Sequence, residues 1–234
     1  MRWCKLHNRT EVVRGVAYQV QSPAGQLASA IPTRSLLAQV LGITALGLCV
    51  TALSAYLLQG APFGVGLIAM LIGFGVLLAI NATRQNEALS LGLFYLFAFL
   101  EGVGIAPVIG TYVRSVGPDI VINAALTTGV GMLTLGAVVY VTGLDLRRFA
   151  GWVYGALLAL VVVGIISIFV HFIQPTTYSW ITLAIFTFLT LIDFARIRAG
   201  GDGLTPVQMA VQIYLDAINI FLAILQIFGG RRRT

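Results

Sequence analysis

Seven long apolar blocks, separated by short polar segments, run along the chain from residue 35 onward. Each block holds about 20 residues without amphipathic intervals, which is the length that an α-helix needs to cross a bilayer core of ~30 Å. The pattern therefore predicts an all-α integral membrane protein, a bundle of seven transmembrane helices. The expected spans are residues 35–58, 62–81, 88–112, 120–141, 149–172, 178–198 and 206–228.

The segments on either side of these blocks are polar. Residues 1–34 mix Arg, His, Gln, Ser and Pro, and they lack the apolar core of about 7–15 residues that a cleavable signal peptide contains. We expect a polar cytoplasmic leader at residues 1–34, a transmembrane domain at residues 35–228 and a basic tail at residues 229–234, with the first helix acting as its own insertion signal.

Turn-forming residues mark the ends of the last two spans. Thr205 followed by Pro206 is typical of an N-cap and the first residue of a helix. Gly200 and Gly201 can terminate the preceding helix. The last two spans are therefore predicted to form a tight helical hairpin.

The composition supports the membrane class. Of 234 residues, 59% are hydrophobic and 9% are charged, whereas a soluble domain has about 25% charged residues. The net charge of +6 comes from arginines at the ends of apolar blocks, without a basic stripe that carries aromatic residues, so we expect no nucleic-acid binding. Cys4 and Cys49 predict neither a disulfide framework nor a metal site.

Positive charges gather on one side of the predicted topology. Because Arg and Lys in short loops stay in the cytoplasm, the N-terminus is predicted there, and after seven crossings the C-terminus lies outside. The basic tail would itself favour the cytoplasm, which leaves a re-entrant last segment as the alternative, although the length of this span favours a crossing. The residues that set the orientation are Arg2, Lys5, Arg9, Arg14, Arg34, Arg84, Arg147, Arg148, Arg196 and Arg198, against Arg114 alone in the opposite loops.

Three of the eight acidic residues fall inside predicted spans: Glu101 in the third, Asp193 in the sixth and Asp216 in the seventh. An ionised carboxylate at the centre of a membrane helix costs roughly 2.5–3.5 kcal/mol on insertion scales. We therefore expect these side chains to face the bundle interior, a partner or water. A packed acid that is neutral or paired, without a function, remains the alternative for each.

The seventh span carries a stripe of polar side chains on one helix face. The spacings of four, four, three and seven residues keep the stripe on one side of an α-helix. Such a stripe has no place in lipid, so the last helix is predicted to lie at the centre of the bundle or to line a water-filled path. A stripe that only joins helices by hydrogen bonds is the alternative. Its members are Gln208, Gln212, Asp216, Asn219 and Gln226.

Asp193 and Asp216 lie at depths that differ by roughly 7 Å at 1.5 Å per residue, so antiparallel neighbours can bring the two carboxylates together. Two acids in contact cannot both ionise cheaply, and we expect them to titrate as a unit and to form a proton-sensitive latch. The same oxygens suit Ca²⁺, with Gln212 and Asn219 one turn away. Arg84, on the same predicted side as Asp193, is either the cation of the latch or a plain positive-inside anchor.

Four segments carry a family resemblance. LIDFARI at residues 191–197 and YLDAINIF at residues 214–221 resemble the paired signature of the Bax inhibitor-1 family, also called the transmembrane Bax inhibitor motif proteins. FAFLEG at residues 97–102 resembles the third helix of that family, and TGLDL at residues 142–146 resembles its fourth loop. The resemblance covers about residues 34–228.

This resemblance implies a seven-helix bundle with the C-terminal helix at its centre. It also implies a pH-sensitive Ca²⁺ leak in which two aspartates form a proton-responsive pair latched by an arginine, roles that map onto Asp193, Asp216 and Arg84. Ca²⁺ is then the permeant or bound ion, and no other cofactor is expected. Gln208, Gln212, Asn219 and Glu101 are the candidates to line the path.

Two other functions stay open. A membrane regulator that binds proteases or stress proteins is compatible with the sequence. An intramembrane aspartyl protease also places one Asp on each of two successive helices, but the Gly-x-Gly-Asp motif of those enzymes is missing before Asp193 and Asp216, so we expect no enzyme. Compact loops favour the plasma membrane of a bacterium, with the lipid bilayer, protons and Ca²⁺ as the partners.

Overall fold

The computed structural model describes residues 33–170 and 173–231. The predicted leader, apart from its last residues, and the end of the basic tail lie outside the described residues. Within the described ranges the chain forms seven long helices and the short 3₁₀ segment η1 (Arg147–Phe149). The long helices are α2 (Thr33–Leu57), α3 (Phe63–Ala82), α4 (Glu87–Val116), α5 (Asp119–Thr142), α6 (Ala150–Val170), α7 (Pro175–Arg198) and α8 (Pro206–Arg231).

All seven helices are long and apolar enough to cross a membrane, which confirms the predicted fold class. The largest difference from the predicted spans is at the end of α4, which runs to Val116 instead of residue 112. Arg114 lies in the last turn of α4, where a positive charge interacts favourably with the helix dipole. Gly117 ends the helix with a φ of 107°. The last helix, α8, is a single continuous helix, which favours a crossing over a re-entrant segment.

Local capping chemistry fixes the ends of the hairpin between α7 and α8. The backbone N–H of Gly201 donates to the carbonyl of Arg196, and Gly200 and Gly201 adopt positive φ, so the two glycines terminate α7 as predicted. At the start of α8, the N–H of Gln208 donates to the Thr205 hydroxyl, and the N–H of Thr205 donates to the Gln208 amide oxygen. This reciprocal pair is a capping box.

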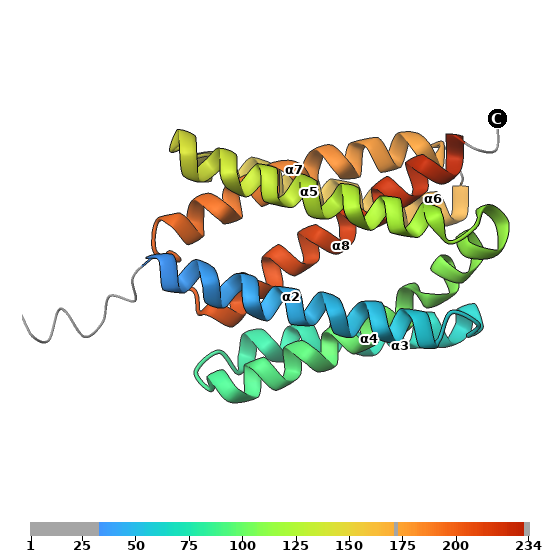
Figure 1. The fold of residues 1–234 in the computed structure, drawn as a ribbon, viewed down its shortest axis with the longest axis horizontal. Helices are drawn as coiled ribbons and strands as arrows, with labels where there is room; N and C mark the ends of the chain where they lie inside the picture. The colour runs from blue at the N-terminus through green and yellow to red at the C-terminus, as the bar shows by residue number, and fades with distance from the viewer. Residues whose placement is uncertain (1–32, 171–172, 232–234) are drawn as a thin grey trace, which may run out of the picture. The chain divides into compact units, whose positions relative to one another are not determined.

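The helix α8 lies at the centre of the bundle, as predicted. It packs against α2, α4, α5 and α7, and Figure 1 shows it running between α5 and α2. In the most apolar part of α8, 61% of the residues are buried inside the protein. In the most apolar part of the span that contains α6, only 6% are buried. The outer helices therefore present their apolar side chains to lipid, while α8 is screened from it.

The interface of α2, α4 and α8 is built around Tyr214, which is fully buried. Its ring meets those of Phe94 and Phe97 of α4 edge-on, with ring centroids 5.4 and 5.8 Å apart. Its hydroxyl shares a hydrogen bond with the Thr51 hydroxyl of α2. Gly102 lets α4 approach α2 here, because a Cβ at this position would collide with the Thr51 carbonyl and the Ser54 hydroxyl.

Candidate functional site

Asp193 and Asp216 are both buried, on the neighbouring helices α7 and α8. Only 4% of Asp193 and 3% of Asp216 is exposed. The two carboxylates lie within electrostatic reach of each other. The structure therefore brings together the two acids that the sequence singles out, and neither points into the lipid.

The cation on this pair is Arg196. Its Nη1 donates to Asp193 Oδ1 over 2.8 Å and to Gln212 Oε1 over 3.0 Å. Arg196 follows Asp193 by three residues on α7, a spacing that places both side chains on one helix face. Gln212 belongs to α8, so one guanidinium ties the two helices together at the level of the pair.

The carboxylate of Asp216 has fewer hydrogen-bond partners than that of Asp193. Asp216 Oδ2 is buried and has no hydrogen-bond partner among the described residues. Thr190 of α7 lies against this carboxyl group, while its hydroxyl donates to the Phe186 carbonyl. An ionised oxygen without a partner is costly in such a place, and a proton or a visiting cation removes the cost.

A chain of alternating charges connects the pair to two loops. Asp202, in the α7–α8 loop, lies 3.8 Å from Arg196 Nε and 2.8 Å from Arg147 Nη1. Arg147 also pairs with Asp145 over 2.8 Å. The hydrogen bonds from Arg147 lower the pKa of Asp145 to about 2. These loop pairs are partly exposed, so each contributes little alone, but together they join the α5–η1 loop to the buried site.

Arg84 does not occupy the place that the sequence analysis gave it. It is exposed in the turn between α3 and α4, and Arg196 is the cation that contacts Asp193. The spacing of three residues within LIDFARI is a signal that Arg196 pairs with Asp193, whereas the positive-inside rule uses this arginine only as a marker of orientation. The pairing of Arg147 with Asp202 joins two loops and has no comparable signal in the sequence.

The polar stripe of α8 meets several different partners. Gln212 joins the acid pair, whereas Gln208 is used in the capping box. Asn219 donates to the Leu215 carbonyl of its own helix, and Gln226 accepts a hydrogen bond from Ser179 of α7. Only Gln212 and Asp216 of the stripe therefore take part in the candidate site in this conformation.

Glu101 lies apart from this arrangement. It is partly buried in α4, within electrostatic reach of the Tyr214 hydroxyl. Tyr214 packs against α4, whereas Asp216 lies beside Thr190 of α7. The structure thus places Glu101 at the interface of α4 and α8, and its role in lining a path stays a prediction.

The site offers few ligands for a resident cation. Among the described ranges, no three His, Cys, Asp or Glu side chains group closely enough to hold a metal ion. Ca²⁺ takes six to eight oxygen ligands, while the pair and Gln212 supply two carboxylates and one amide oxygen, beside the guanidinium of Arg196. This donor set suits brief contact with a passing cation better than stable binding.

Comparisons with known proteins agree on the class of protein. The family model described as inhibitor of apoptosis-promoting Bax1 matches residues 33–233. The chain is 27% identical to an uncharacterized membrane protein of Streptococcus pyogenes, covering 82% of this chain and 91% of the relative. It is 25% identical to the inner membrane protein YbhL of Escherichia coli (84% and 92% covered) and 24% identical to an uncharacterized membrane protein of Vibrio cholerae (81% and 85% covered). The chain therefore belongs to the Bax inhibitor-1 family of membrane proteins.

Proposed function

We propose that this protein is a proton-gated leak for Ca²⁺ or related cations, with Asp193 and Asp216 as the proton sensor and Arg196 as the latch. One observation carries the proposal: two buried carboxylates share a site in which a single guanidinium neutralises only one of them. Such a pair is sensitive to the binding of one proton, because two like charges in a buried site repel each other.

The direction of gating follows from the ion pair. Ionised Asp193 holds Arg196, and Arg196 holds Gln212, so α7 and α8 stay joined. A proton on Asp193 removes the attraction, and Asp202 then offers the guanidinium a second carboxylate toward the loop. Acidification therefore releases the hairpin and opens the path, and the leak is expected to increase as the pH falls.

The orientation and the location are part of the proposal. Arg147, Arg148, Arg196 and Arg198 all lie near the end of the bundle that carries the α7–α8 loop. Cationic loops are retained in the cytoplasm, which supports a cytoplasmic N-terminus and a latch at the inner side of the membrane. A relative with the name inner membrane protein supports the plasma membrane of a bacterium.

Flux through purified protein tests the proposal. The protein is reconstituted in liposomes that contain a Ca²⁺ indicator, and the rate of Ca²⁺ entry is followed between about pH 5 and pH 8. The variants are Asp193→Asn and Asp216→Asn, with Asp119→Asn as the matched control, because Asp119 is exposed at the start of α5. The parent and the control are expected to leak more at acidic pH, and the two variants to lose this response.

The same preparation separates the alternatives. A folded, reconstituted protein that passes no Ca²⁺ at any pH removes the channel proposal. Cleavage of a reporter peptide that depends on Asp193 and Asp216 would indicate a protease, and retention of a bacterial protease by the silent protein would indicate a regulator.

A further inference from the structure

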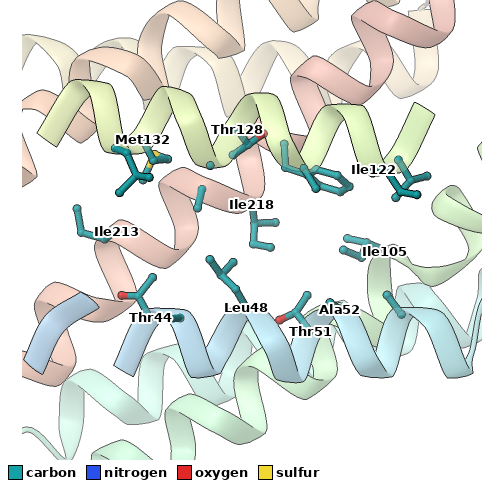
Figure 2. Close-up of a pocket in the computed structure, with 18 of the residues that line it drawn as sticks. Thr44, Leu48, Thr51, Ala52, Ile105, Ile122, Thr128, Met132, Ile213 and Ile218 are labelled. Carbon is teal, nitrogen blue, oxygen red and sulfur yellow. The ribbon is translucent and has the colours of Figure 1, made fainter. Parts of the chain in front are cut away.

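A long apolar groove lies between α2 and α5, with α8 as its floor. Figure 2 shows Thr44, Leu48 and Ala52 of α2 facing Ile122, Thr128 and Met132 of α5, with Ile213 and Ile218 of α8 behind them. The groove has a volume of about 1080 Å³, at the upper end of the range for ligand pockets. Its lining on α2 extends from Leu37 to Tyr56, roughly 28 Å at 1.5 Å per residue, which is close to the thickness of the bilayer core.

The rim of the groove is open to the membrane. Tyr56 on α2 is 69% exposed, and Ile122 and Leu133 on α5 are 55% and 71% exposed. The medium around these helices is hydrocarbon, and an empty space of this size loses the packing contacts of its walls. The acyl chain of a membrane lipid is apolar, is present in this medium and is flexible enough to fill a long groove.

The threonine hydroxyls in the lining already have hydrogen-bond partners within the protein and need none from a ligand. The Thr44 hydroxyl donates to the Ala210 carbonyl, the Thr128 hydroxyl donates to the Ala124 carbonyl, and the Thr51 hydroxyl bonds with Tyr214. These hydroxyls are satisfied within the protein. The middle of the groove thus presents methyl and methylene groups, which suits an acyl chain.

One end of the groove has different chemistry. Tyr140, near the end of α5, belongs to the lining, and its buried hydroxyl has no hydrogen-bond partner among the described residues. Arg198 lies within electrostatic reach of that hydroxyl, and its Nη2 donates to the Gly143 carbonyl over 2.7 Å. The guanidinium of Arg198 at this end of the groove is a suitable partner for the phosphate of a lipid headgroup.

We propose that this groove binds an anionic phospholipid, with one acyl chain between α2 and α5 and the phosphate at Arg198, at the end of the groove that Tyr140 lines. The charge of Arg198 selects a headgroup with net negative charge over a zwitterionic one. Neither Asp193 nor Asp216 belongs to the lining of the groove, and its occupancy does not depend on the proposed leak.

Photo-crosslinking tests the site directly. The purified protein is placed in phosphatidylcholine vesicles that contain a trace of phosphatidylglycerol with a diazirine on its acyl chain, and the labelled peptides are mapped after illumination. We expect label to concentrate on α2 and α5. The Arg198→Gln variant should lower the preference for this probe over the same phosphatidylcholine probe by about tenfold.

Two glycines of α5 provide a matched pair of variants. A Cβ at Gly129 or at Gly131 meets no atom within 4 Å, so neither position is closed to a side chain by a neighbouring atom at the Cβ. Gly129 lines the groove, whereas Gly131 is not part of the lining. Gly129→Leu is therefore expected to reduce labelling by about tenfold, and Gly131→Leu to leave it unchanged.

Three results would overturn the proposal. The first is label spread evenly over the lipid-facing helices and unaffected by Gly129→Leu. The second is equal labelling by both headgroup probes in the parent, which removes the anionic lipid. The third is absence of label on α2 and α5 in a protein that is dimeric in the vesicles, which assigns the groove to a second copy of the chain.

Discussion

The guanidinium of Arg196 lies 2.8 Å from the carboxylate of Asp193, three residues earlier on α7, and it neutralises this one carboxylate of the buried acid pair. The Arg196 side chain is 14% exposed and that of Asp193 is 5% exposed. Loss of one partner of a buried ion pair leaves an uncompensated charge, which commonly costs about 3–5 kcal/mol. Because Arg196 retains some contact with solvent, the cost here falls at or below the lower end of this range.

The first prediction concerns the latch. Arg196→Gln removes the charge that holds Asp193. The variant is expected to leak at pH 8 about as fast as the parent leaks at pH 6, because the closed hairpin has lost its main electrostatic tie. Arg196→Lys, which keeps the charge, should restore part of the closure. Parent-like flux in Arg196→Gln at every pH would remove Arg196 from the mechanism.

The second prediction concerns Arg84, the arginine that the family resemblance suggests as the latch. Its side chain is exposed in the turn between α3 and α4. Arg84→Gln is expected to change the Ca²⁺ flux by less than about twofold and to leave its pH dependence unchanged, since exposed charges contribute little. A leak at neutral pH as large as that of Arg196→Gln would instead return the latch to Arg84.

The third prediction concerns the loop charges. Hydrogen bonds from Arg147 depress the pKa of Asp145 to about 2, so its contribution is fully present above an unfolded pKa of about 3.9 and is lost only as the pH falls toward 2. The pair of Asp145 and Arg147 therefore stays ionised across the gating range. Asp145→Asn is expected to alter the size of the flux but not the pH of its midpoint. A shifted midpoint would place part of the sensor in the loops.

The fourth prediction concerns packing. A Cβ at Gly102 collides with the Thr51 carbonyl and the Ser54 hydroxyl, so Gly102→Ala must separate α4 from α2. Overpacking of this kind costs about 1–3 kcal/mol, seen as a lower melting temperature of the detergent-solubilised protein. Gly42→Ala is the control, because a Cβ at Gly42 meets no atom within 4 Å. An equal effect of the two substitutions would contradict the close contact.

The fold follows from the sequence because lipid imposes strong constraints on it. Apolar length alone locates the seven helices, and Thr205 with Pro206 and the glycines at 200 and 201 give the ends of the last hairpin. The polar stripe identifies α8 as the central helix, since no other position spares these side chains from hydrocarbon. The same reasoning places Asp193 and Asp216 in the interior.

The partners of each polar group are harder to predict, because they depend on helix rotation and loop geometry. Gln208 and Gln226 share a face with Asp216, yet one caps α8 and the other meets Ser179. The positive-inside rule treats Arg196 as a loop charge, whereas the structure places it on α7 in an ion pair with Asp193. The groove has no signal in the sequence at all, since its lining combines apolar residues from helices far apart in the chain.

The most direct test of the central claim is the Ca²⁺ flux of four proteins in liposomes across about pH 5 to pH 8: the parent, Asp193→Asn, Asp216→Asn and the double variant. Asp193→Asn is expected to leak at every pH, because Arg196 has lost its partner. Asp216→Asn is expected to stay closed over this range, because Asp193 no longer has a like charge beside it and holds Arg196 continuously. The double variant is expected to behave as Asp193→Asn does. Independent, additive effects of the two substitutions, with the parent's pH midpoint retained, would show that the two carboxylates do not act as a pair.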